Sequence, residues 1–370
     1  MGAVATEEIG NKILNWSRYI KTRDLTASKR IKKEIDKELK KTENNQDLIN
    51  YYTLLNSRYY LMINDIQKAN QSINSIDPII KKLGGPEEAE AYYKYFFQGL
   101  YKGYQGENNE ALIFFKLAEE QLNKVKNPIE IAEFRFKLGS LFYNKKSTLL
   151  SIYYIQQARD TFASLNSESD DFLYQRVMFC DTTLALNLID QGEYDKAEKS
   201  LIYVLKRARD NNDQLLKAMT LYNVGFLKTK RKENKAAVEY ILEALDIKEF
   251  KESQPINYLC AVYELCRIYY KNRVFHEANK HHQKGLETAM RLEHRPFQCK
   301  FRILFALYIN RDHKVVEKNM MDLYNHGDYV DLEELSLDVA KFYSDNNDYR
   351  RSVHYYEMHI QCLNKLKINT

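Results

Sequence analysis

The chain has 370 residues, more than one hydrophobic core usually serves, so we expect either two domains or one elongated repeat array. Its 12 glycines and 5 prolines are few for this length, which disfavours hairpins and predicts an all-α fold. The net charge of +5 neither demands nor excludes nucleic acid, and the five scattered cysteines indicate a reduced compartment. No stretch has the ~20 apolar residues of a spanning helix, so we expect a cytoplasmic protein.

The first 75 residues predict an N-terminal three-helix bundle. Apolar residues recur every three or four positions over 7–20, again over 26–41, and again from residue 46 or 47 onward, as they do along the buried stripe of a helix. Residues 76–92 are predicted to be a linker, because they contain the run KLGGPEE (82–88) with two glycines and a proline.

Residues 93–370 predict a tetratricopeptide-repeat domain. The sequence repeats with a period of ~40 residues, as helical solenoids do. Small residues fall where two paired helices would cross, which lets their backbones approach closely. Stacked pairs of this kind build a right-handed superhelix with a concave inner surface. An unrelated helical bundle with chance periodicity is the alternative. The small crossing residues are Gly99, Gly139, Gly225 and Gly285.

The sequence contains no motif of a self-contained enzyme. It has no phosphate-binding glycine loop and no nucleophile elbow. His276 and His281 lie five residues apart, whereas two imidazoles on one helical face that bind the same zinc ion are four apart, so no metal site is predicted. A direct transcription factor is an alternative, although the first sixty residues lack a clear helix-turn-helix.

Four segments of the chain carry a resemblance to a known family. They are IGNKILNWSRYIKTRDL, ENNQDLINYYTLLNSR, TLYNVGF and DLEELSLDVAKFYSDNNDY. These segments resemble the Rap family of response-regulator aspartate phosphatases, which are tetratricopeptide proteins controlled by Phr peptides in quorum sensing. The similarity covers nearly the whole chain and includes the domain order. It implies a phosphatase that removes the phosphoryl group from the receiver aspartate of a sporulation phosphorelay regulator. It also implies inhibition by a secreted and reimported Phr-type oligopeptide.

The resemblance implies that Gln46 is the catalytic residue. A carboxamide can position the attacking water without placing negative charge beside the phosphoryl group. Asn45, Asp47, Ile49 and Ser57 are the expected receiver contacts, and Asn45 and Ser57 differ from the residue types common in the family. No cofactor is expected in this chain, because the partner receiver brings the divalent metal.

The resemblance also implies a peptide-binding surface formed by Asn187, Asp190 and Asn223. An asparagine can pair with both polar groups of an extended peptide backbone, and Asp190 can pair with a basic side chain. Asn187 and Asn223 could instead bridge helices. The expected partners are thus a response regulator and a short peptide, with no membrane and no direct nucleic acid. The runner-up function is non-catalytic sequestration of a competence-type regulator's DNA-binding domain, relieved by peptide.

Overall fold

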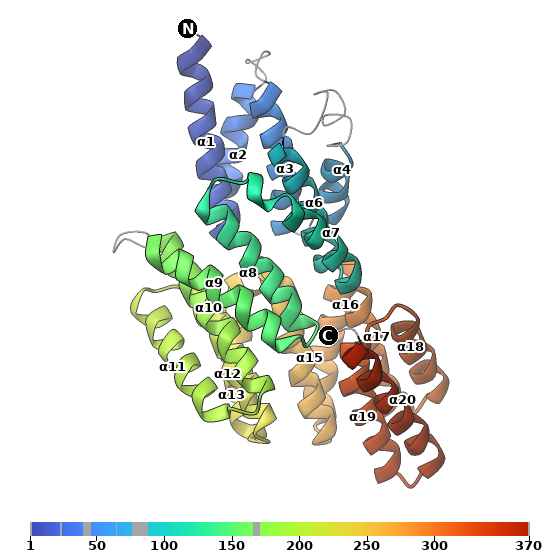
Figure 1. Cartoon of the computed structure of the whole chain (residues 1–370). Helices are drawn as coiled ribbons and strands as arrows, with labels where there is room; N and C mark the ends of the chain where they lie inside the picture. The colour runs from blue at the N-terminus through green and yellow to red at the C-terminus, as the bar shows by residue number, and fades with distance from the viewer. Residues whose placement is uncertain are drawn as a thin grey trace. The chain divides into compact units, whose positions relative to one another are not determined.

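The computed structural model describes residues 2–22, 24–39, 46–63, 65–75, 88–165 and 171–368. Within these ranges all regular structure is helical, which confirms the all-α prediction, and no helix there is long and apolar enough to cross a membrane (Figure 1). The chain divides by contacts into two compact units. Unit 1 comprises Met1–Leu138 and Tyr154–Asp181, and unit 2 comprises Gly139–Tyr153 and Thr182–Thr370.

The helices follow one another with short connections. The first group is α1 (Gly2–Thr22), α2 (Leu25–Leu39), α3 (Gln46–Met62), α4 (Ile66–Asn74), α6 (Glu88–Tyr104), α7 (Asn108–Glu120), the short 3₁₀ helix η1 (Leu122–Lys124), α8 (Pro128–Asn144), α9 (Thr148–Leu165) and α10 (Asp171–Asp190). The second is α11 (Tyr194–Asp210), α12 (Gln214–Lys230), α13 (Asn234–Asp246), α14 (Lys248–Ser253), α15 (Pro255–Lys271), α16 (Phe275–Arg291), α17 (Arg295–Phe305), the π-helical turn η2 (Ala306–Asn310), α18 (His313–Asn325), α19 (Tyr329–Asp345) and α20 (Tyr349–Ile368).

Helices α1, α2 and α3 share one apolar core, which confirms the three-helix bundle. Trp16, the only tryptophan of the chain, is fully buried there. Its indole Nε1 donates a hydrogen bond to Ser28 Oγ at 3.0 Å, and its ring stacks on Tyr52 with centroids 5.2 Å apart. The polar end of the indole is therefore satisfied while its body fills the core. The other buried members are Ile9, Ile13, Ile20, Ile35, Leu55, Tyr59 and Met62.

A fourth helix, α4, follows the bundle and was not predicted. Its Ala69 is fully buried against Leu61 of α3, in a cluster that includes partly buried residues of α6. Most of the predicted linker (76–87) lies outside the described residues, and the last five positions of that prediction, 88–92, form the start of α6. The predicted boundary between bundle and repeats stays a prediction.

A buried cluster of charges joins the bundle to later helices of unit 1. The Arg176 guanidinium of α10 pairs with Glu133 of α8 at 2.5 Å, and Glu133 also pairs with Arg58 of α3 at 3.3 Å. Arg176 Nη2 donates a further hydrogen bond, 2.8 Å long, to the carbonyl oxygen of Lys21 near the end of α1. The Lys21 ammonium in turn pairs with Glu130 of α8. Helices from distant parts of the sequence are thus tied together where water is excluded, and we call these five residues the unit 1 charge cluster.

Neighbouring helices meet at small residues, as the sequence predicts. A Cβ added to Gly225 of α12 would lie 2.6 Å from Ile241 Cγ1 of α13, and one added to Gly285 of α16 would lie 2.3 Å from Phe301 Cζ of α17. Both distances are too short for real carbon contacts, so glycine is required for this packing. Many of the tight turns between helices contain one left-handed residue, for example Lys146, Gly192, Lys232, Arg273 and Asn347.

Candidate functional site

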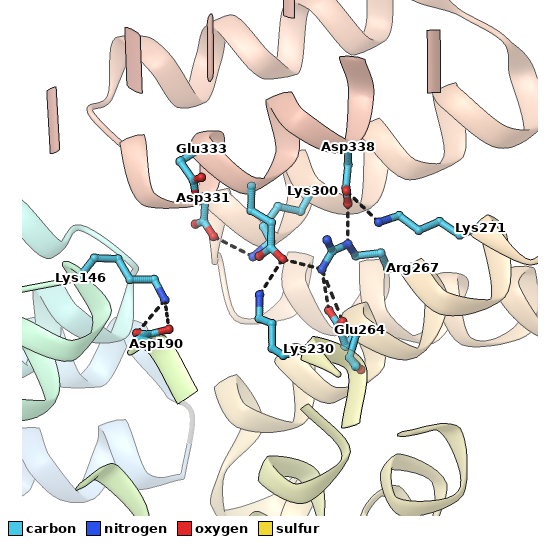
Figure 2. A network of polar contacts seen from close by, with 12 residues as sticks. Lys146, Asp190, Lys230, Glu264, Arg267, Lys271, Lys300, Asp331, Glu333 and Asp338 are labelled. Carbon is cyan, nitrogen blue, oxygen red and sulfur yellow. Dashed lines mark hydrogen bonds and ion pairs between the residues drawn. The ribbon is translucent and has the colours of Figure 1, made fainter. Parts of the chain in front are cut away.

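Charged side chains from the first helices of successive pairs converge within unit 2. Figure 2 shows side chains of α12, α15, α17 and α19 pointing toward one another. These helices are far apart in sequence; Lys230 and Glu334, for instance, are 104 residues apart and lie 3.1 Å from each other. We call the set the inner-face network. Its members are Lys230, Glu264, Arg267, Lys271, Lys300, Asp331, Glu334 and Asp338.

Arg267 is the centre of this network. Its Nη1 lies 2.7 Å from Glu334 and 3.2 Å from Glu264, and its Nε lies 2.5 Å from Asp338. Burial alone raises the pKa of the Glu334 carboxyl, but the cations Arg267 and Lys230 outweigh it and hold that pKa well below its usual range. Glu334 is thus an anion at neutral pH, and 43% of its side chain is exposed.

A second cation of the network lies over aromatic rings. The Lys300 ammonium is 4.6 Å from the centroids of both Tyr263 and Phe297, and it pairs with Asp331 at 2.8 Å. Cation–π contact and ion pairing together fix this ammonium in place. The inner-face network therefore combines fixed charges of both signs with an ammonium packed on buried aromatic rings.

Asp190, predicted from the sequence to bind peptide, is next to this network. Its carboxylate accepts from the Lys146 ammonium at 2.8 Å, with 14% of the Asp190 side chain and 40% of the Lys146 side chain exposed (Figure 2). Burial raises the pKa of the Tyr143 hydroxyl, and Asp190, Cys260 and Glu334 raise it further. The carboxylates of Asp190 and Glu334 are therefore both close enough to this hydroxyl to affect its ionisation. An exposed pair of this kind is weak enough for a competing cation to replace Lys146.

The two predicted asparagines differ in their surroundings. Asn187 is fully buried and its Nδ2 donates to Ser151 Oγ and to the Thr183 carbonyl, both at 2.9 Å. In this conformation its Nδ2 bridges α9 and α10, while its Oδ1 is buried without a hydrogen-bond partner within the described residues. Asn223 of α12 is 6% exposed and has no hydrogen bond to its amide within the described residues. This amide is therefore not committed to another group of the protein and can both donate to and accept from a ligand backbone.

The predicted receiver-binding residues surround the beginning of α3. Gln46 is the first residue of this helix, and Asn45 and the side chains of Gln46 and Asp47 lie outside the described residues. Ile49 is half-buried. Ser57 has no exposed surface, and its hydroxyl donates to the Leu54 carbonyl at 2.8 Å. Helix packing encloses the Ser57 side chain in this conformation, and its expected contact with a receiver stays a prediction.

The inner-face network itself was not predicted from the sequence. The signal was present as charges spaced by three or four on α15 and on α19, which lie on one face of each helix. Nothing in that spacing says which charge meets which, since the partners are far apart in the chain.

Comparison with known proteins gives a consistent result. A family model described as response regulator aspartate phosphatase H, N terminal, matches residues 3–64, which contain nearly all of α1 and the whole of α2 and α3. Response regulator aspartate phosphatase I of Bacillus subtilis (strain 168) is 29% identical over 365 residues, 97% of this chain and 91% of the relative. A crystal structure of a Rap protein complexed with competence and sporulation factor has a TM-score of 0.82 at 28% identity, covering 98% of this chain and 99% of that one. The chain is thus similar to Rap proteins over nearly its whole length, in sequence and in fold.

Some relatives of similar identity are named as regulatory proteins and not as phosphatases. Regulatory protein RapD of the same strain is also 29% identical, over 349 residues that cover 92% of this chain and 95% of the relative. The similarity spans both units, so the Rap resemblance applies to the bundle that contains Gln46 and to the helices that contain Asp190 and Asn223.

Proposed function

We propose that this protein is, like its Rap relatives, a response-regulator aspartate phosphatase whose activity is inhibited by a short Phr-type peptide. The observation that carries the proposal is the position of Gln46, the first residue of α3, inside the segment that matches the Rap N-terminal domain. The first N–H groups of a helix lack intrahelical acceptors and favour a negatively charged group nearby. A carboxamide at this place suits the phosphoryl group of a receiver aspartate.

In this proposal the chain contributes one amide, and the receiver contributes the phosphoaspartate and a divalent metal ion. The Gln46 amide would orient water in line with the leaving oxygen, and positioning is the main source of catalysis in such a reaction. Asn45, Asp47 and Ile49 would contact the receiver around it. The cytoplasm, where response regulators act, is the proposed location, and a sporulation phosphorelay regulator is the first substrate to test.

The inner face of unit 2 is the proposed peptide site. The Asn223 amide would pair with the peptide backbone, and a basic peptide side chain would exchange with Lys146 on Asp190. Peptide inhibition would then act as a shift between two populations of the protein, one of which binds the receiver.

The test is phosphate release from a phosphorylated receiver. Wild type is expected to accelerate release, while Gln46→Ala removes the acceleration and keeps receiver binding. Gln46→Glu is also expected to be inactive, because its carboxylate repels the phosphoryl group. Gln67→Ala is the matched control, since Gln67 is exposed on the neighbouring helix α4. Wild-type acceleration that survives in Gln46→Ala would refute the assigned role.

Peptide binding is tested separately by calorimetry with candidate pentapeptides. Asn223→Ala and Asp190→Ala are expected to weaken binding at least tenfold, or about 1.4 kcal/mol each. If no receiver is dephosphorylated but the chain blocks a regulator from binding its DNA, the protein acts by sequestration and not by catalysis.

A further inference from the structure

The helix α20 has two apolar stripes, and only one of them is used inside the protein. The first stripe is buried, and α20 makes close contact with α19. The second stripe faces solvent and contains only large side chains. Its members are Tyr349, Val353, Tyr356, Ile360 and Leu363, which are 63%, 55%, 37%, 57% and 36% exposed.

The spacing of this second stripe is four, three, four and three residues. It is the spacing of a coiled-coil seam, in which each position faces a partner helix. The solvent-exposed face of a helix in a globular protein is usually polar. The outer face of α20 is instead apolar over about 21 Å of helix, calculated at 1.5 Å per residue. A face of this kind requires a helical cover.

The charged residues beside the stripe indicate which helix packs against it. Arg350 and Glu357 are exposed, both follow a stripe residue by one position, and neither has an ion-pair partner within the described residues. If a second α20 lies antiparallel, Tyr349 faces Ile360 of the other copy. In that register the two Arg350 side chains come next to the Glu357 side chains of the opposite copy, so two ion pairs form around one twofold axis. A parallel arrangement brings no opposite charges together.

We propose that two copies of this protein associate through antiparallel pairing of their α20 helices. The seam is short, so the association is a reversible dimerisation that depends on protein concentration. It places the twofold axis at the C-terminal helix, away in sequence from Gln46 and from Asp190. The proposal is independent of the phosphatase reaction, and its test requires neither receiver nor peptide.

Sedimentation velocity of the full chain over a concentration series tests the association. Wild type is expected to shift from monomer to dimer as concentration rises, whereas Val353→Glu with Ile360→Glu stays monomeric. Leu149→Glu is the matched control, because Leu149 on α9 is 80% exposed and outside the stripe. Unchanged helicity by circular dichroism shows that the variants are folded. A wild type that is monomeric at every soluble concentration, or a double variant that dimerises normally, overturns the proposal.

Charge reversal tests the antiparallel register. Arg350→Glu and Glu357→Arg are each expected to raise the dimer dissociation constant roughly tenfold, because two ion pairs become two repulsive contacts. The two changes combined restore the pairs and the affinity. If the combined variant is as weak as either single one, the register is refuted.

Cysteine cross-linking gives a second measure of direction. Tyr349 and Ile360 are roughly 16 Å apart along one helix, too far for a disulfide within the chain. Tyr349→Cys combined with Ile360→Cys is expected to form a cross-linked dimer under oxidation, and Tyr349→Cys alone is not. A cross-link in the single variant indicates parallel helices and contradicts the proposal.

Discussion

Replacement of Arg176 by methionine tests the unit 1 charge cluster. The change leaves Glu133, which has no exposed surface, with Arg58 as its remaining partner at 3.3 Å, and it removes the donor to the Lys21 carbonyl. Breaking a buried ion pair by removing one partner costs about 3–5 kcal/mol, and an unsatisfied buried carbonyl costs about 1–3 kcal/mol. Arg58 offsets part of this loss, so we expect unit 1 to lose about 3–5 kcal/mol.

Urea unfolding followed by Trp16 fluorescence measures this loss. Trp16 is the only tryptophan and is buried in the bundle, so its emission reports on unit 1. Arg159→Met is the control, because its ion pair with Asp181 is partly exposed and is worth less than about 1 kcal/mol. If Arg176→Met unfolds at the same urea concentration as Arg159→Met, the cluster does not stabilise the unit as argued.

The stability difference between wild type and Arg176→Met depends on pH, and its direction follows from the pKa of Glu133. Burial raises the pKa of Glu133, but Arg176 and Arg58 outweigh it and hold that pKa below the ordinary value of 4.5. The ionised Glu133 therefore stabilises the folded state above pH 4.5, and this contribution is lost as pH falls through the folded pKa. The difference between wild type and Arg176→Met is expected to shrink in acid. A difference that grows below pH 4.5 would contradict the assignment.

Three further predictions concern unit 2. Gly225→Ala is expected to lower stability by about 1–3 kcal/mol in thermal unfolding, because the new methyl meets Ile241; an unchanged melting temperature would refute the tight crossing. Arg273→Gly is expected to raise stability by roughly 0.5–1 kcal/mol, since Arg273 has a φ of 61° and is exposed, and a loss of stability would contradict this. Burial lowers the pKa of His282 to about 4, so stability should fall by up to about 3 kcal/mol as pH drops from 6.5 toward 4; His282→Leu should flatten that slope, measured by urea unfolding at each pH.

The spacing of apolar and small residues along the chain predicted helix α1 and two of the helix crossings. The stripe around Trp16 placed α1 correctly, and Gly225 and Gly285 marked real helix crossings, because these signals lie within one or two helices. Helix α4 was missed since it has nine residues and few apolar ones, so its position depends on Ala69 fitting between α3 and α6.

The side-chain roles that depend on tertiary packing were harder to predict. Ser57 was expected at a receiver surface, but helix packing buries it. The resemblance implied peptide contact for Asn187, while its Nδ2 donates to Ser151 of a neighbouring helix. The pairing of Lys230 with Glu334 has no sequence signal, because only the stacking of several helix pairs brings residues 104 positions apart into contact.

The inner-face network has a consequence for ligand choice. Each of its cations already has an anion beside it, so a charged ligand entering this face exchanges partners and gains little from its overall charge. A charge at the wrong position along the ligand leaves one protein group unpaired and is penalised. The protein would therefore bind two ligands of equal net charge but different residue order with different affinities. Related signals in one cell could be kept separate in this way, because a ligand with its charges in the wrong order would bind weakly.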